Sequence, residues 1–383
     1  MNEKTPDNLP LELYVHVPFC VKKCRYCDFY SGPASEETKK AYVERLKEEI
    51  RSSAFGHGEK ERVISVYFGG GTPSILPEED LVSVLSVLRE EFAFSDSPEI
   101  TVECNPGTVS FEKLQAYRAA GVNRLSLGLQ SVRNDVLEAI GRIHTFEEFL
   151  ESYGAARKAG FTNVSVDLIS GLPKDTPESF EKGLKTVLAL SPEHLSVYSL
   201  ILEENTELYA LNEAGRLDLP SEEEEREMAH LAVRTLRSFG YLQYEISNFA
   251  LPGFRSVHNT GYWTGVPYLG FGSAAASYYG GKRFRNAPSL RYSDLPYEET
   301  EILTEEDRMN EFMMLGLRMT EGVSDRAFRE RFGRSFYEFK GESLRKLRNE
   351  GLLVGEKKAD GDETVRLSAL GKDLANYVFR EFV

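Results

Sequence analysis

Apolar and polar positions alternate in two different ways along the chain. Six short runs rich in Val, Ile, Leu and Tyr are typical of strands buried on both faces. These runs lie at about residues 12–17, 63–68, 99–103, 124–129, 163–169 and 195–201. Between them, apolar residues recur with the spacing of helices that bury one face. The helical stretches lie at about residues 36–53, 78–92, 110–119, 133–158 with an interruption, 177–190 and 221–238.

The order of these stretches indicates a fold class. Strand–helix repeats predict parallel strands joined by crossover helices. Six such units predict an α/β fold, a partial and open (β/α)6 barrel, over residues 1–240. In barrels of parallel strands, the chemistry lies at the carboxyl ends of the strands. Glycines and polar residues that follow the apolar runs are therefore the candidates for a functional site.

The pattern changes after about residue 240. Residues 241–300 are rich in Gly, Tyr, Asn and Ser with short strand patterns, and we interpret them as a connecting region. Residues 301–383 return to helical spacing and end in a helix, a strand, a turn and a second strand. This order predicts a C-terminal α+β domain that is similar to a winged helix.

Charge and composition narrow the classes of partner. The chain has 46 Lys and Arg against 61 Asp and Glu, a net charge of −15, which disfavours nucleic acid as a partner. A packing or docking role for the winged-helix-like region is therefore favoured over DNA binding. No apolar run is long enough to span a bilayer, and the polar start is unlike a signal peptide. With few cysteines, we expect a cytoplasmic protein, with peripheral membrane contact and a homodimer left open.

Three of the four cysteines lie together after the first apolar run. Cys20, Cys24 and Cys27 have the spacing C-x3-C-x2-C. Thiolates bind iron–sulfur clusters, and a cubane usually takes four of them. Three thiolates on one loop can hold three irons and leave the fourth open, which a site needs if a small molecule is to bind the metal.

Other interpretations of these cysteines are weaker. Disulfides need pairs, and three close cysteines cannot all pair with one another. A structural zinc site normally needs a fourth ligand, for which only His16 or Asp28 is near in sequence. No second CxxC or HxxxH cluster occurs elsewhere. The fourth cysteine, Cys104, ends an apolar run, and we interpret it as a buried structural thiol.

Polar residues and glycines follow several of the apolar runs. Gly69–Gly71 follow the second run, where glycine lets the backbone approach a ligand closely, although a glycine triplet alone is more often a turn. Glu103 and Gln130 end the third and fourth runs and can bond to a ligand's amino group or hydroxyl. Arg142 can pair with a carboxylate through two hydrogen bonds. Asp167 is polar within an apolar run, and a structural hydrogen-bonding role stays open for it.

The cysteine loop, the segment Gly69-Gly-Gly-Thr-Pro73 and the distal segment His258-Asn259-Thr-Gly-Tyr262-Trp263 together resemble the radical S-adenosylmethionine (SAM) superfamily, in its HemW branch of haem chaperones. The resemblance runs from about residue 12 to the end of the chain. It implies one [4Fe–4S] cluster held by the three cysteines, with SAM on the open iron. The positions it matches to the SAM site are Tyr14, Tyr26, Gly70, Gly71, Thr72, Glu103, Gln130, Arg142 and Asp167.

The distal segment matches the H-N-x-x-Y-W pattern of this branch. The resemblance implies a haem site with His258 as the axial ligand and Asn259, Tyr262 and Trp263 beside it. The chemistry agrees, because histidine is a common axial ligand and aromatic faces stack on flat rings. The other interpretation, a hydrogen-bonded histidine with aromatic residues as local core, stays open.

Three functions compete on this evidence. The first is a chaperone that binds haem and delivers it to acceptor proteins such as respiratory enzymes. The second is the related oxygen-independent coproporphyrinogen III oxidase, which removes two propionate carboxylates with a 5′-deoxyadenosyl radical. The third is a radical SAM enzyme with another substrate, such as RNA. The oxidases carry a further cysteine where this chain has Phe29, and a longer N-terminal segment. Both departures favour the chaperone, and we expect no coproporphyrinogen oxidase activity.

Overall fold

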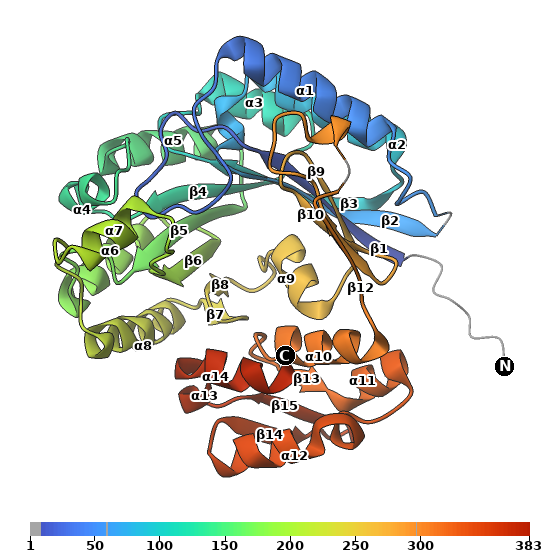
Figure 1. Cartoon of the computed structure of the whole chain (residues 1–383). Helices are drawn as coiled ribbons and strands as arrows, with labels where there is room; N and C mark the ends of the chain where they lie inside the picture. Colours follow the sequence, from blue (N-terminus) through green and yellow to red (C-terminus); the bar gives the residue numbers. More distant parts are fainter. Residues whose placement is uncertain (1–8, 59, 296) are drawn as a thin grey trace.

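The computed structural model describes residues 9–383 apart from positions 59 and 296. Six parallel strands stand side by side in chain order at the centre of one sheet (Figure 1). They are β1 (Leu9–Val17), β2 (Glu61–Gly70), β3 (Phe94–Cys104), β4 (Arg124–Gln130), β5 (Val164–Ser170) and β6 (His194–Ser199). The predicted α/β fold with an open sheet is confirmed. Only β3 starts well before its predicted bound, because Ser95 to Pro98 interrupt the apolar signal after Phe94.

Helices cover the outer face of the curved sheet (Figure 1). They are α1 (Glu36–Arg51), α2 (Glu78–Glu91), α3 (Phe111–Ala119), α5 (Phe146–Lys158), α6 (Pro177–Leu188) and α8 (Glu222–Ser238). Two short helices, α4 (Asn134–Ala139) and α7 (Glu207–Glu213), lie beside the cysteine loop instead, and a 3-10 turn, η1 (Pro73–Ile75), follows β2. Serine or threonine side chains cap α1, α3, α5, α6, α7 and α8 at their amino ends, which fixes where these helices begin. The short helix α7 was not predicted, because it buries only Leu208 and leaves little apolar pattern.

Residues after 240 extend the same sheet at both edges. Next to β6 lie β8 (Asn248–Ala250) and β7 (Leu242–Gln243). On the other side, β9 (Tyr268–Phe271) pairs in parallel with β1, followed by β10 (Ala276–Tyr279), β11 (Lys282–Arg285) and β12 (Glu299–Ile302), with η2 (Tyr292–Asp294) between the last two. Helix α9 (Val257–Thr264) lies between these two groups of strands (Figure 1). The segment predicted as a connecting region therefore completes the sheet.

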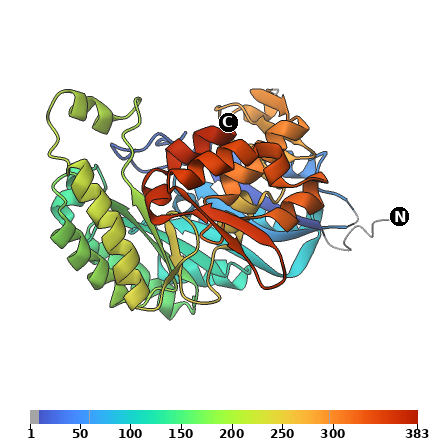
Figure 2. The same cartoon turned by 90° about the horizontal axis from the view of Figure 1, so that it is seen from below.

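The C-terminal part has a hydrophobic core of its own. Its elements are α10 (Glu305–Gly316), β13 (Val323–Ser324), α11 (Asp325–Phe332), α12 (Phe336–Asn349), β14 (Leu353–Lys357), β15 (Glu363–Leu367), α13 (Ala369–Asp373), α14 (Ala375–Phe379) and η3 (Arg380–Phe382). Three of its strands form a small antiparallel sheet in the order β13-β15-β14. Figure 2 shows this part in front of the large sheet, with α8 beside it. The domain limits near residues 240 and 300 stay predictions.

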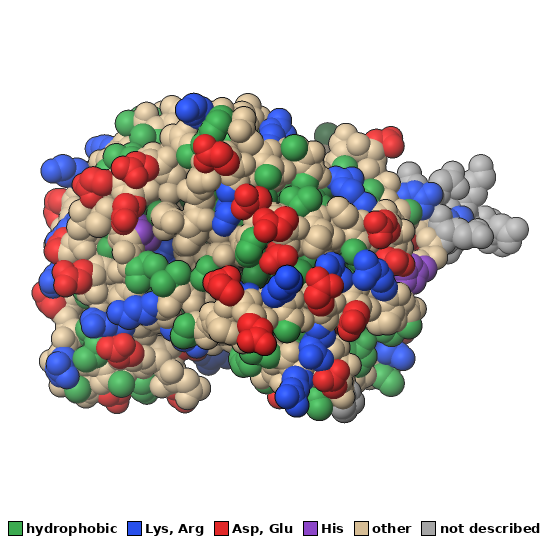
Figure 3. Space-filling model, turned by 90° about the horizontal axis from the view of Figure 1, so that it is seen from above, with side chains coloured by type: hydrophobic (Ala, Val, Ile, Leu, Met, Phe, Trp, Pro, Cys, Tyr) green, Lys and Arg blue, Asp and Glu red, His purple; other side chains and the backbone are tan. Residues whose placement is uncertain are grey.

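Two surface properties bear on partners. Acidic and basic side chains are interspersed on the face seen from above in Figure 3. Among the residues that the structure describes, no helix combines the length and the apolar character needed to cross a membrane.

Candidate functional site

The three clustered cysteines lie on the loop between β1 and α1, at the carboxyl end of β1. All three are partly exposed and carry free thiols. The loop is fastened at two points, because the Cys20 N–H donates to the Gly32 carbonyl at 3.0 Å and the Arg25 N–H donates to the Ile140 carbonyl at 3.0 Å. The thiols are therefore presented from a held backbone.

Two donors from other elements reach the sulfurs. The Thr72 hydroxyl lies 3.6 Å from Cys20 Sγ, and Arg142 Nη1 lies 3.5 Å from Cys24 Sγ. A hydroxyl and a guanidinium stabilise thiolate charge, so the surroundings fit ligands to iron. Within the described residues, no three acidic, His or Cys side chains are gathered closely enough to hold a single metal ion. A cluster differs from a single ion, because each thiolate binds a different iron and the sulfurs stay further apart.

Gly70 packs directly against β1, and Gly71 packs against the start of the cysteine loop. Gly70 has a φ of +110°, and a Cβ there would lie 2.5 Å from the His16 ring. A Cβ on Gly71 would lie 2.7 Å from the Phe19 carbonyl oxygen. Both glycines are thus required by the close approach of this segment to β1 and the loop, whatever ligand binds beside them.

Glu103 and Asp167 share the space inside the sheet beyond the glycines. Glu103 accepts hydrogen bonds from the Tyr67 hydroxyl at 2.8 Å and from the Gly70 N–H at 3.2 Å. Burial, together with the nearby Asp167 charge, raises the pKa of Glu103 to about 7. Asp167 accepts bonds from the Ser126 hydroxyl at 2.9 Å and the Ser165 hydroxyl at 3.3 Å, as the structural interpretation expects. Its pKa is raised by burial.

Asn105 is a site residue that sequence reasoning missed. Its side-chain nitrogen donates to Thr72 Oγ1 at 2.7 Å, and its oxygen accepts from Arg142 Nη2 at 2.8 Å. It therefore joins the two residues that contact Cys20 and Cys24. The sequence could have indicated Asn105, because it follows directly on β3, two residues after Glu103.

The remaining predicted SAM-site residues lie on the same side of the sheet. Gln130 ends β4 with a left-handed φ of +70°, which is rare for a residue with a side chain. The Tyr14 hydroxyl bonds to His16 Nδ1 at 3.0 Å. Tyr26 lies on the cysteine loop, where burial raises its pKa. The structure thus places most of the predicted residues at the carboxyl ends of β1 to β4. Tyr14 and Asp167 lie further inside β1 and β5, and Tyr14 also lines a cavity beside Tyr262.

His258 lies on α9 and is almost fully buried, with 1% of its surface exposed. Its Nδ1 lies 2.8 Å from the Ser65 hydroxyl, and its Nε2 lies 2.9 Å from the Tyr262 hydroxyl. Burial, with the nearby Arg124 charge, lowers the pKa of His258 to about 3, so the ring is neutral. Both ring nitrogens are therefore occupied by hydrogen bonds in this conformation.

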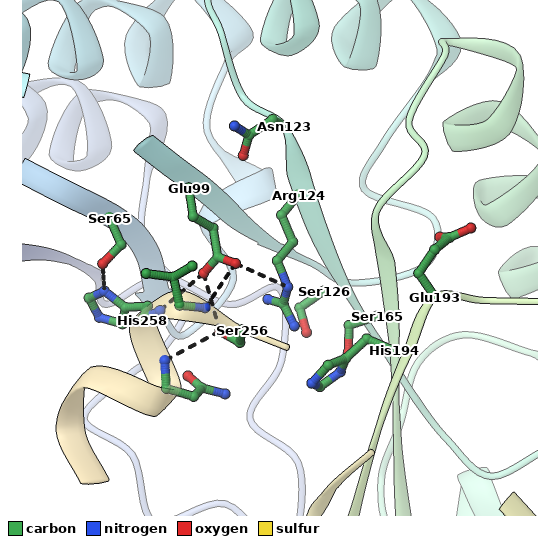
Figure 4. Close-up of polar contacts among 12 residues, drawn as sticks. Ser65, Glu99, Asn123, Arg124, Ser126, Ser165, Glu193, His194, Ser256 and His258 are labelled. Atoms are coloured by element: carbon green, nitrogen blue, oxygen red, sulfur yellow. Dashed lines mark hydrogen bonds and ion pairs between the residues drawn. The ribbon is translucent and has the colours of Figure 1, made fainter. Parts of the chain in front are cut away.

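The amino end of α9 is held by a buried carboxylate (Figure 4). Glu99 accepts from the Val257 N–H at 3.0 Å, the His258 N–H at 3.1 Å and the Ser256 hydroxyl at 3.2 Å. Arg124, 1% exposed, lies 4.0 Å from Glu99 and balances its charge. A carboxylate is favourable at a helix amino terminus. Sequence reasoning missed both residues, although a charged residue at the start of a buried strand is a usable signal.

The rest of the distal motif lies around the same helix. The Asn259 N–H bonds to the Ser256 hydroxyl at 3.3 Å, within the helix cap. Tyr262 and Trp263 line a cavity of about 310 Å³ between α9, the β9–β11 strands and α10. The Arg318 guanidinium lies 4.2 Å from the centre of a Trp263 ring.

Family models match both parts of the chain. Residues 14–187 match the radical SAM superfamily, and residues 303–359 match the HemN C-terminal domain. The chain is also similar to a solved structure, the radical SAM coproporphyrinogen III oxidase HemN of Escherichia coli. The TM-score is 0.82 at 27% identity, over 98% of this chain and 90% of that one.

Curated relatives match the chain almost from end to end. The chain is 40% identical to heme chaperone HemW of Bacillus subtilis, over 97% of this chain and 98% of the relative. It is 36% identical to heme chaperone HemW of Lactococcus lactis, over 98% of this chain and 97% of the relative. The radical SAM superfamily implies SAM and a [4Fe–4S] cluster, with which the thiols and donors at the end of β1 agree. The chain belongs to the HemW family of the radical SAM superfamily.

Proposed function

We propose that the protein is a haem chaperone that binds haem and delivers it to acceptor proteins. The observation that carries this function is the near full-length similarity to relatives that are named heme chaperones. Respiratory enzymes are the proposed class of acceptor. A homodimer, peripheral membrane contact and a cytoplasmic location stay predictions from the sequence.

We assign the cluster to Cys20, Cys24 and Cys27. Arg142 and Thr72 support this assignment, because they donate to two of the three sulfurs from outside the loop. When bound, the cluster would supply the electron for reductive cleavage of SAM. Asn105 would keep Thr72 and Arg142 at their sulfurs, since it bonds to both.

His258 as the axial ligand to haem iron stays a prediction with a structural condition attached. Iron could reach Nε2 only after the hydrogen bond to Tyr262 breaks and the side chain becomes accessible. Coordination by His258 therefore requires a rearrangement around Tyr262, and spectroscopy of the haem complex would reveal the ligation.

The test combines binding and transfer. The cluster is reconstituted without oxygen, haem is titrated by its Soret band, and the loaded protein is mixed with apocytochrome b562. Directed delivery gives a transfer rate that rises with acceptor concentration, whereas free dissociation gives a constant rate. Absence of stoichiometric haem binding would contradict the proposed function.

Coproporphyrinogen III oxidation is the second candidate, favoured by the likeness to the HemN structure over nearly the whole chain. Phe29, 60% exposed on the cysteine loop, occupies the position of the oxidases' further cysteine. We expect no protoporphyrinogen from coproporphyrinogen III with reductant and SAM. Repeated turnover at about 1 s⁻¹ or faster would instead make the protein an oxidase.

A further inference from the structure

An aromatic cavity lies where the large sheet meets the C-terminal part. Tyr262 and Trp263 of α9, Tyr268 of β9, Tyr278 of β10 and Phe312 of α10 supply its walls. Its volume of about 310 Å³ falls within the range of small-molecule sites, which are mostly apolar with a few polar groups. We name it the seam cavity. Figure 1 shows α9 and α10 next to one another, with the strands of β9 and β10 above them.

The tyrosines of this cavity form a continuous row. The rings of Tyr262 and Tyr268 meet edge to face at 4.7 Å, and Tyr268 lies 6.3 Å from Tyr278. Tyr262 is also the residue whose hydroxyl bonds to His258. His258 is therefore a positioning residue for one wall of the cavity while remaining outside it.

One face of α10 forms the opposite side. Arg308, Glu311, Phe312 and Leu315 all line the cavity and follow the spacing of neighbours on a single helix face. The cavity is thus apolar along its aromatic walls and charged where α10 begins.

The arginines of the cavity are not equally engaged. Arg283 pairs with Glu311 at 2.6 Å, so its charge is balanced. Arg308 and Arg331 have no carboxylate partner among the residues that the structure describes. Each guanidinium donates to one backbone oxygen, Arg308 to Thr304 and Arg331 to Gly265, both at 3.4 Å. Arg331 also lies over the rings of Phe312 and Phe332, at 5.5 and 5.8 Å from their centres. In a chain with a net charge of −15, two such arginines on one small cavity indicate an anionic ligand.

We propose that the seam cavity binds the haem ring, with the two propionates on Arg308 and Arg331. This inference rests on the proposed function. A flat aromatic ring suits the aromatic walls, and two carboxylates suit two unpaired guanidinium groups. Arg331 is exposed and Arg308 half-buried, so the propionate edge lies at the rim. A cavity of this size leaves part of the ring exposed, and a chaperone that hands over its ligand needs such an exposed edge.

The experiment changes the protein and the ligand independently. The full-length double variant R308Q/R331Q is compared with wild type in Soret titrations of haem and of haem dimethyl ester, whose carboxylates are blocked. The matched control is R345Q, an exposed arginine of α12 away from the cavity. Rim ion pairs predict about a threefold loss of affinity for each arginine and about a tenfold loss for both.

The expected result is a tenfold weaker binding of haem by the double variant, with the diester bound equally by variant and wild type. R345Q binds haem as wild type does. If wild type binds haem but the double variant binds it equally well, the proposed haem site in the seam cavity is wrong, while the proposed chaperone function is unaffected. If wild type binds no haem, both the proposed haem site and the proposed chaperone function are contradicted. If the double variant misfolds, the wild-type protein still tests the proposal. Equal wild-type affinities for haem and its diester would exclude binding of the propionates by Arg308 and Arg331.

Discussion

The two ends of the large sheet hold their polar residues in different ways. At the carboxyl ends of the strands, Cys20 and Cys24 are partly exposed on a loop, and donors from other elements reach their sulfurs. Towards the amino ends, Glu99, Arg124 and His258 are almost completely buried and bond to one another across long stretches of sequence. The thiols at the first end are therefore within reach of solvent. The second end fixes helix α9 in place, so the His258 motif there does not by itself locate a ligand.

The largest effect is expected at the cluster end. Cys24→Ala removes one of three thiolates, and the cluster absorbance after anaerobic reconstitution should disappear. Cys104→Ala is the matched control, because Cys104 is buried in the apolar core and donates to the Val102 carbonyl. A full cluster in Cys24→Ala would falsify the ligand assignment.

The next effect concerns the buried pair at the other end. Arg124→Met leaves the Glu99 carboxylate buried without its balancing charge, and the free energy of unfolding should fall by about 3–5 kcal/mol. Urea unfolding followed by circular dichroism measures the loss. Arg326→Met removes an exposed arginine that pairs with Asp360, and should cost no more than about 1 kcal/mol. Equal losses would mean that the Glu99–Arg124 pair does not anchor α9.

A pH dependence follows from Glu12, which is buried on β1, 3.9 Å from His258. Burial raises its pKa from 4.5 to about 9, so the folded protein keeps a proton that the unfolded chain releases. The free energy of unfolding should therefore fall as pH rises from 4.5 towards 9, because the unfolded chain loses this proton over that range. Glu12→Gln should flatten the profile over that range. The exposed Glu90→Gln is the control, and an unchanged slope in Glu12→Gln would rule out the buried carboxyl as its source.

The smallest effect separates the two interpretations of His258. Tyr262→Phe removes the hydroxyl from His258 Nε2 and should cost about 1 kcal/mol of stability. If haem lies in the seam cavity, the variant should bind haem with nearly the wild-type Soret maximum. A shifted maximum that is lost again in His258→Ala would show that the freed imidazole ligates the iron.

The sequence was sufficient for features that are local. The six strands, the cysteine loop and the residues directly after the strands follow from periodicity and short spacings. Asn105 could have been added by the same rule. The hydrogen-bond partners of His258 could not be predicted from the sequence, because Ser65 and Glu99 are brought to α9 only by the fold. The placement of residues 241–302 at both edges of one sheet could not be predicted either, since the sequence of a short strand does not indicate which strands it pairs with.

The pairing of β9 with β1 has a consequence for synthesis on the ribosome. Glu12 to Val15 have their parallel partners at Tyr268 to Phe271, so one side of β1 lacks its neighbour until most of the chain has emerged. Throughout that interval the nascent chain presents an unpaired strand edge, which invites pairing with other chains. The sheet can close its first strand only late, and such distant pairing slows folding. Expression at a reduced elongation rate should therefore lengthen the aggregation-prone interval of this protein.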